Sequence, residues 1–156
     1  MSTANAQSLL HNVYLFKDLA PKELEVVSAV SKLETFNAGD EIFTEGEKAH
    51  SLYVIKFGTV KIQHSGKDDR VDVATLGTGS HFGEMAFVDK EKRSASVSVT
   101  ERAEIVRIDF EALAKVLETN PAIAVKVYRS MALFLCGRLR MTTTDLSFAR
   151  EKIRHS

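Results

Sequence analysis

The chain has 156 residues, of which 44% are hydrophobic and 27% are charged, as expected for one globular domain with a real core. Its 21 Lys and Arg residues balance its 21 Asp and Glu residues, so no overall field draws it to nucleic acid or an anionic membrane. The single cysteine, Cys136, excludes an internal disulfide, and the sequence shows neither a signal peptide nor an apolar run of the ~20 residues that span a bilayer; we therefore expect a cytoplasmic, single-domain protein.

The first predicted element is a helix in the segment "LAPKELEVVSAVSKLETF". Its apolar residues recur at spacings of three, at Leu24, Val27, Val30 and Leu33. Pro21 suits the first turn of a helix, whereas Ala20 is a poor N-cap, so the sequence does not fix where the helix begins. We assign residues 15–36 to this N-terminal helical part.

From about residue 37 to residue 109 the chain changes to short segments rich in β-branched and aromatic residues, separated by seven of the eight glycines. The segment "VIKFGTVKI" predicts a hairpin that turns near Phe57 and Gly58. The segment "HSGKDDR" predicts a polar turn that joins two further strands. Many short strands with glycine turns predict an antiparallel sandwich or roll.

After Asp109 the helical period returns in two segments. Asp109 can cap "DFEALAKVLETN", and the pair Asn120-Pro121 supplies a cap and a first turn for the next helix. The apolar face of this longer helix consists of Ile123, Val127, Met131, Phe134 and Leu135. Gly137 and the run of threonines at 142–144 predict a weakened helix, which "DLSFAREKIRHS" could restart with Asp145 as its cap.

The stretch "GSHFGEMAFVDKEKRSASVSV", residues 79–99, carries the strongest chemical signal. Gly83 at the end of a strand lets a ligand approach the backbone, and "EMAFV" can form one helical turn whose free N–H groups suit an anion. Arg93 offers a planar fork for two phosphate oxygens, and the small Ser94 and Ala95 leave their N–H groups accessible. Glu84 is an acceptor only, which suits a ribose hydroxyl. The implied ligand has a phosphate and a hydroxyl close together, as a nucleotide has.

Two alternatives compete with this interpretation. Glu84 and Arg93 alone would make a common surface ion pair, worth about 0–1 kcal/mol; the glycine and the small residues favour a ligand site instead. A metal site of the cupin type would draw on His50, His64, His81 and Glu84, but no H-x-H pattern occurs, and a strand would hold residues 81 and 84 on opposite faces. We expect His81 to face solvent. No P-loop, Rossmann or G-x-S-x-G motif occurs, so we expect neither a metal site nor an enzyme.

The chain resembles the cyclic nucleotide-binding domain family, to which catabolite activator proteins and regulatory subunits of protein kinase A belong. The segment "FGEMAFVDKEKRSASV" matches the family's phosphate-binding cassette, and "AGDEIFTEGEKAHSLYVIKFGTVKI" matches its first strands. The resemblance covers roughly residues 15–120. It implies an antiparallel β-roll of the jelly-roll, double-stranded β-helix type over residues 37–109, with the cassette at 82–97, an N-terminal helix, and C-terminal hinge and lid helices at 110–156.

The resemblance also implies roles for individual residues. Glu84 would accept the ribose 2′-hydroxyl, and Arg93 would pair with the exocyclic phosphate oxygens. The phosphate shell would be completed by the N–H groups of Gly83, Ala86 and Ser94, with the Ser94 hydroxyl. The purine pocket would be lined by Val73, Ala74 and Phe82. The full set of expected ligand-binding residues is Val73, Ala74, Phe82, Gly83, Glu84, Met85, Ala86, Arg93, Ser94 and Ala95.

The implied function is a stand-alone sensor that binds cAMP in preference to cGMP, uses no other cofactor, and signals through its C-terminal helices to a partner protein or a second copy. Only 12 residues follow Thr144, too few for a helix-turn-helix, so we expect no DNA-binding domain and no membrane segment in this chain. Two alternatives remain. The first is a protein-interaction domain of the same fold that no longer binds nucleotide, and the second is the truncated sensor domain of a transcription regulator.

Overall fold

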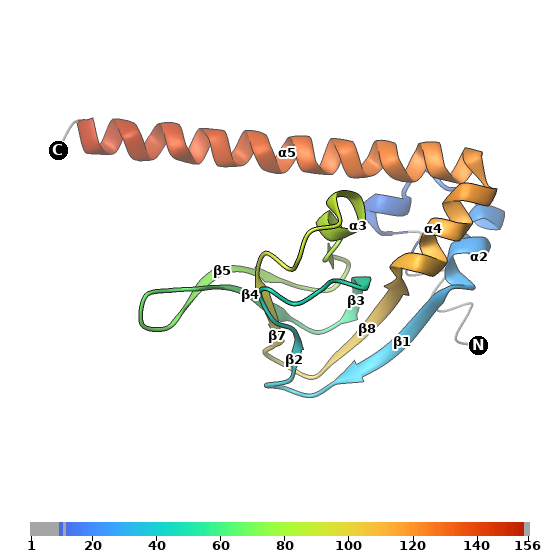
Figure 1. Cartoon of the computed structure of the whole chain (residues 1–156), viewed down its shortest axis with the longest axis horizontal. Coiled ribbons are helices and arrows are strands. Elements are labelled where there is room, and N and C mark those ends of the chain that lie inside the picture. The colour runs from blue at the N-terminus through green and yellow to red at the C-terminus, as the bar shows by residue number, and fades with distance from the viewer. Residues whose placement is uncertain (1–9, 11, 155–156) are drawn as a thin grey trace.

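The computed structural model describes residue 10 and residues 12–154, and in this part eight strands form two four-stranded antiparallel sheets, ordered β1-β8-β3-β6 and β2-β7-β4-β5 (Figure 1). The strands are β1 (Ser31–Phe36), β2 (Glu41–Phe43), β3 (Ser51–Phe57), β4 (Val60–Ser65), β5 (Arg70–Leu76), β6 (His81–Phe82), β7 (Ser96–Val99) and β8 (Ala103–Asp109). The helical elements are η1 (Tyr14–Phe16), α2 (Pro21–Ser28), α3 (Met85–Asp89), α4 (Phe110–Thr119) and α5 (Pro121–Arg154). The predicted antiparallel β-roll with flanking helices is confirmed.

The turn near Gly58 carries the chain from one sheet to the other. The predicted hairpin is therefore wrong, because β3 pairs with β6 and β8, whereas β4 pairs with β5 and β7. Gly58 has a φ of +111°, and a Cβ there would lie 2.7 Å from the Cα of Ala103, so only glycine fits this crossing. The predicted polar turn between two strands is confirmed, since β4 and β5 pair from Ser65 and Arg70 inward.

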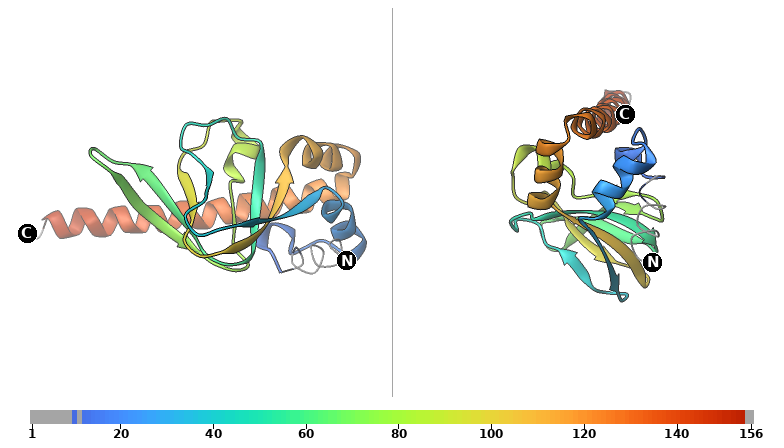
Figure 2. Two further views of the ribbon diagram at one scale, coloured as in Figure 1. Left: turned by 90° about the horizontal axis from the view of Figure 1, so that it is seen from below. Right: turned by 90° about the vertical axis from the view of Figure 1, so that its right-hand side faces the viewer.

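Two apolar cores lie on opposite faces of the sheet that contains β3 and β8. Ile55 and Ile105 face the interior of the roll, and Val54 and Val106 face the helices. Both strands are thus apolar on both faces, as expected for strands covered on two sides. Figure 2 shows the helices gathered on one side of the roll. The helices therefore close the core on that side and leave the other sheet to form the outer wall of the roll.

The N-terminal helix is shorter than the sequence pattern predicts. Helix α2 ends at Ser28, and Leu33 lies in β1, where it is 41% exposed. At the start of α2, the N-cap residue Ala20 has no side chain that can cap the helix. Its N–H instead donates to Oε1 of Glu23 at 2.8 Å, which is one of the two hydrogen bonds of a capping box. Over a few residues, the apolar spacing of a helix is hard to distinguish from that of a strand, so the helical pattern was extended to Leu33, which belongs to β1.

The C-terminal helix α5 is one continuous helix of 34 residues, so the predicted weakening between Gly137 and Thr144, with a restart at Asp145, is wrong (Figure 1). The hydroxyl groups of Thr142, Thr143 and Thr144 each donate to the carbonyl four residues earlier, at 2.9–3.0 Å. The threonine hydroxyls thus find acceptors within the helix, at a slight cost in helix stability. Within residues 12–154, no helix combines the length and apolar character needed to cross a bilayer.

Candidate ligand-binding site

A pocket of about 940 Å³ lies between the cassette segment and α5. Of the ten predicted ligand-binding residues, only Ala74 does not line it; this residue pairs with Ile62 across the β4–β5 ladder. Val73 and Met85 are about half exposed, whereas Phe82 is 4% exposed and stacks on Tyr53 with ring centroids 5.1 Å apart. The structure thus brings the predicted residues to one cavity, with Ala74 excepted.

Gly83 sets the turn at which the cassette leaves the sheet. It follows β6 directly, has a φ of +83°, and a Cβ there would lie 2.8 Å from Nη1 of Arg93. Glycine is therefore favoured by the backbone angle, and a side chain here would also displace the guanidinium of Arg93. The predicted short helical turn is confirmed as α3, which begins immediately after Glu84.

Arg93 is buried beneath the pocket, with only 6% of its surface exposed. Its Nη1 donates to the Gly83 carbonyl at 3.1 Å, and its Nη2 donates to the Ser51 carbonyl at 2.5 Å. The guanidinium carbon lies 3.9 Å from the centroid of the Phe43 ring, which is cation–π distance. Burial lowers the pKa of the Arg93 guanidinium, since removal from water disfavours its charge.

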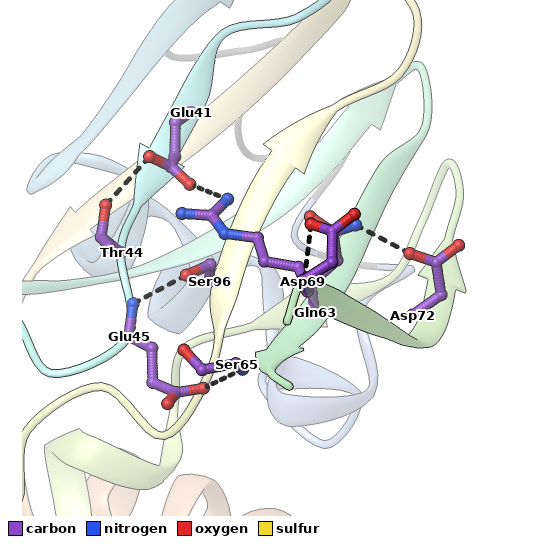
Figure 3. Close-up of polar contacts among 9 residues, drawn as sticks. Glu41, Thr44, Glu45, Gln63, Ser65, Asp69, Asp72 and Ser96 are labelled. Atoms are coloured by element: carbon purple, nitrogen blue, oxygen red, sulfur yellow. Dashed lines mark hydrogen bonds and ion pairs between the residues drawn. The ribbon is translucent and has the colours of Figure 1, made fainter. Parts of the chain in front are cut away.

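The loop between β2 and β3 fixes the backbone of Arg93. The Arg93 N–H donates to the Glu47 carbonyl at 2.8 Å, and the Gly46 N–H donates to the Arg93 carbonyl at 2.9 Å. Figure 3 shows how this loop is anchored at Glu45: its N–H donates to Oγ of Ser96 at 2.8 Å, and its carboxylate accepts from the Ser65 N–H at 3.2 Å. Arg93 is thus held in position through its backbone by this loop and through its guanidinium by the Ser51 and Gly83 carbonyls.

The carboxylate of Glu45 also contacts His64, since Nδ1 of His64 lies 3.1 Å from Oε1 of Glu45. The hydrogen bonds from His64 and Ser65 lower the pKa of Glu45. Because His64 lines the pocket, this exposed contact joins the anchored loop to the pocket wall.

Glu84 is buried at the pocket wall, with 3% of its surface exposed. Its Oε1 lies 2.8 Å from Nδ1 of His81, although the two atoms are not aligned as a hydrogen bond. The prediction that His81 faces solvent is wrong, since α5 covers β6 and leaves His81 only 6% exposed. The prediction that a strand separates residues 81 and 84 is also wrong, because the chain turns at Gly83 and brings Glu84 back toward His81.

The predicted small residues of the cassette lie beside Arg93. Ser94 is exposed and Ala95 is 9% exposed, and both line the pocket with Ala86. Among the residues with described positions, no three His, Cys, Asp or Glu side chains are grouped as a metal site requires. The arrangement offers a buried cation and a buried acceptor on one wall, which suits an anion that also carries a hydroxyl.

Sequence reasoning expected C-terminal lid helices but did not identify which residues of α5 line this pocket. The pocket-lining residues of this helix are Phe134, Leu135, Arg138, Leu139 and Thr142. The apolar spacing placed Phe134 and Leu135 on one helical face, but no local pattern says which surface that face covers. Arg138 and Thr142 gave no signal, because polar residues at these positions are equally compatible with a solvent-facing helix.

These features define a ligand-binding β-roll, and comparison with known proteins identifies its class. The model of the cyclic nucleotide-binding domain matches residues 33–120, which is more than half of the chain. The chain therefore belongs to the cyclic nucleotide-binding domain family, in the form found in catabolite activator proteins and protein kinase A regulatory subunits.

Several named proteins are similar to the chain. The cyclic AMP receptor protein of Thermus thermophilus is 31% identical over 134 residues, which cover 85% of this chain and 60% of that protein. A cGMP-dependent protein kinase of Plasmodium berghei is 32% identical over 121 residues, covering 77% and 14%. The crystal structure of Thermus thermophilus catabolite activator protein has a TM-score of 0.77 at 28% identity, covering 86% and 62%. The chain thus spans at most about 60% of the length of these curated relatives.

Proposed function

We propose that the pocket binds a cyclic nucleotide, with cAMP favoured over cGMP, and that binding is communicated through α5. The observation that carries the proposal is the burial of Arg93 with no carboxylate of the described residues at ion-pair distance, although Glu47 and Glu84 lie near enough to raise its pKa against the effect of burial. Arg93 makes no ion pair with any carboxylate in the part of the chain that the structure describes. Since buried charges in proteins are normally paired, an anionic group from outside the chain would complete this site.

A cyclic phosphate fits the donors that remain on Arg93. The guanidinium carries five N–H donors, and its Nε has no partner among the described residues. Because Nε is closed off from the pocket in this position, a phosphate oxygen would bind the guanidinium once it turns from the Ser51 and Gly83 carbonyls toward the pocket that Arg93 lines. Such charge-assisted bonds are strong where water is excluded, which supports an anionic ligand over a neutral one.

Glu84 supplies the second half of the recognition. Its Oε1 faces His81, which leaves Oε2 as the oxygen for a ligand hydroxyl. A ribose keeps its 2′-hydroxyl free when the phosphate closes onto the 3′ and 5′ positions, so a cyclic nucleotide presents the matching donor beside its phosphate. A linear nucleotide carries additional negative charge, which would meet the Glu84 carboxylate unfavourably.

The base would lie between the outer sheet and α5. Val73 from β5 and Leu139 and Thr142 from α5 line this part of the pocket. The Thermus relative is named a cyclic AMP receptor protein, which supports cAMP, and the Plasmodium relative is named a cGMP-dependent kinase, which makes cGMP the second ligand to test.

Binding at this place would bias the position of α5. A ligand shifts an equilibrium only by its difference in affinity for the two states, and a 100-fold difference corresponds to about 2.7 kcal/mol. The second half of α5 carries the exposed side chains of Met141 and Leu146, which do not line the pocket, and of Leu139, which lies at its edge. These apolar groups suit a contact with a partner protein or with a second copy of the chain. Sedimentation velocity of the Leu146→Asp variant tests the second copy, since a dimer through this surface would dissociate.

The central test is calorimetric titration of cAMP and of cGMP into the protein. Removing one partner of a desolvated charge pair costs about 2–5 kcal/mol, so Arg93→Ala should lose most of the binding. Arg70→Ala is the matched control, because Arg70 pairs with Glu41 on the exposed face of β5 and should bind as the parent does. Equal affinity of the Arg93→Ala variant and the parent would refute the proposal and favour an interaction domain that binds no nucleotide.

A further inference from the structure

His81 is a buried titratable side chain for which ligand recognition gives no role. It lies in β6, two residues before Gly83, and is 6% exposed. Neither ring nitrogen makes a hydrogen bond to any residue that the structure describes. If this position only required packing, an apolar residue would fill it without leaving two buried nitrogen atoms unpaired. The presence of histidine therefore indicates that its ring nitrogens have a role.

One edge of the imidazole faces the ligand-binding carboxylate. Nδ1 of His81 lies 2.8 Å from Oε1 of Glu84, within hydrogen-bond distance but out of alignment. A rotation of the imidazole about its Cβ–Cγ bond would align Nδ1 of His81 with Oε1 of Glu84. The imidazole can then donate to the carboxylate. His81 is thus placed to hold one oxygen of Glu84 and to fix the direction of the other.

The ring of His81 also contacts α5. Its centroid lies 4.4 Å from that of Phe134, with the two planes inclined at 55°. Phe134 in turn packs against Tyr14 at 5.8 Å, and the guanidinium of Arg138 lies 5.5 Å from the Phe134 ring. Phe134 is therefore held by contacts to Tyr14 and to His81. A change in the position of the His81 ring would alter the packing of this turn of α5.

We propose that His81 is a positioning residue that couples the orientation of Glu84 to the docking of α5 at Phe134. This inference rests on the proposed function, because it assigns Glu84 to a ligand hydroxyl. When a hydroxyl binds Oε2, the carboxylate settles into one orientation, the His81 contact aligns, and the ring is fixed against Phe134. In the opposite direction, an α5 that is docked through Phe134 holds His81 and preorganises Glu84 for the ligand.

The two contacts of His81 can be separated by two substitutions. His81→Phe keeps a ring against Phe134 but removes the donor near Glu84. His81→Asn keeps a donor near the position of Nδ1 but removes the ring. If His81 only fills space, the variants should rank by how well they fill it, and Glu84 should have no influence on α5.

The first experiment needs no ligand. Hydrogen exchange of α5 residues 131–142 should show a loss of protection in His81→Asn and retained protection in His81→Phe. Glu84→Gln should also alter protection of this segment, and only while His81 is present, which a double-mutant cycle with His81→Phe measures. Unchanged protection of α5 in Glu84→Gln would overturn the coupling. Should either His81 variant fail to fold, Phe134→Leu alters the same contact from the α5 side and replaces it in the cycle.

The second experiment titrates the same variants with cAMP. A hydrogen bond to a charged group corresponds to about a tenfold change in affinity, so His81→Phe should bind cAMP about tenfold more weakly. His81→Asn should recover only part of this affinity, because it restores the donor to Glu84 but not the contact with Phe134. Equal affinity of both variants and the parent would overturn the role of His81 while leaving the proposed function intact. Absence of binding by the parent itself would instead refute the proposed function, and the exchange experiment would still decide the coupling.

Discussion

The two halves of α5 have different surroundings, although they belong to one continuous helix. In the first half, Ile123, Val127 and Met131 are at most 3% exposed and pack in the core between the helices and the sheet. In the second half, Leu139 and Met141 are 67% and 69% exposed. The ligand pocket lies at the junction, where Phe134 and Leu135 line it. The first half therefore belongs to the stable body of the domain, and the second half is available for ligand-dependent contacts.

The largest expected effect comes from the same substitution made in each half. Met131→Ala removes a side chain that is 2% exposed and should lower the free energy of unfolding by about 2–5 kcal/mol. Met141→Ala is the matched control and should change it by no more than about 0.5 kcal/mol. Chemical denaturation followed by circular dichroism measures both. Equal losses in the two variants would mean that the second half is as firmly packed as the first.

The next effect tests whether the pocket at the junction binds its ligand. At 100 times its dissociation constant, cAMP should raise the free energy of unfolding by about 2.7 kcal/mol, since it binds only the folded chain. Met141→Ala should keep this stabilisation, because Met141 is not among the residues that line the pocket. Arg93→Ala should lose it. The comparison fails if cAMP stabilises the Arg93→Ala variant as much as the parent.

A smaller effect concerns Ser130 in the first half of α5. Ser130 is fully buried, and its hydroxyl has no hydrogen-bond partner among the described residues. Ser130→Ala removes this unpaired polar group and should raise the free energy of unfolding by about 1 kcal/mol. Ser28→Ala is the control: Ser28 is equally buried, but its hydroxyl donates to the Glu25 carbonyl at 3.0 Å, so this variant should lose stability. A destabilised Ser130→Ala would show that its hydroxyl has a partner.

The smallest effect concerns the ion pair that ties the first half of α5 to α2. Lys126 donates to Glu23 at 2.6 Å, and this bond, with that from the Ala20 N–H, lowers the pKa of Glu23. Because the folded-state pKa is below the ordinary value of 4.5, the stabilisation is present at neutral pH and is lost as the pH falls through the folded-state pKa. Glu23→Gln should cost about 0.5 kcal/mol at pH 7, since the pair is only partly buried and solvent still screens it.

The pH dependence supplies the control for this pair. Between pH 7 and pH 3 the difference in unfolding free energy between Glu23→Gln and the parent should shrink toward zero. Glu25→Gln, at an exposed position on the same helix, is the control for replacing a glutamate by glutamine. A difference that stays constant with pH would assign the loss to packing rather than to charge.

Local patterns predicted the fold well where the chemistry is local. The glycine-punctuated strands, the cap at Asp109 and the helical turn after Gly83 each follow from a few neighbouring residues, and each is confirmed. The hairpin at Gly58 is wrong because its outcome depends on a distant contact, since Ala103 decides the path of the chain there. The break predicted in α5 is wrong for a different reason: glycine and threonine lower helix propensity without ending a helix.

The candidate site was predictable on its cassette side and not on its helical side. Gly83, Glu84 and Arg93 lie close in sequence, and the types of these residues indicate the chemistry. His81 was misplaced because its burial comes from Phe134, 53 residues later, and one strand gives no sign of what covers it. Arg138 and Thr142 line the pocket only because α5 crosses it, which is a property of tertiary packing.

The most direct test of the central claim is a crystal structure of the protein grown with cAMP. The account predicts the cyclic phosphate against the guanidinium of Arg93, the ribose 2′-hydroxyl on Glu84, and the base between β5 and α5. Cyclic nucleotide bound elsewhere on the surface, or the pocket filled by side chains with Arg93 still held by the Ser51 and Gly83 carbonyls alone, would contradict it.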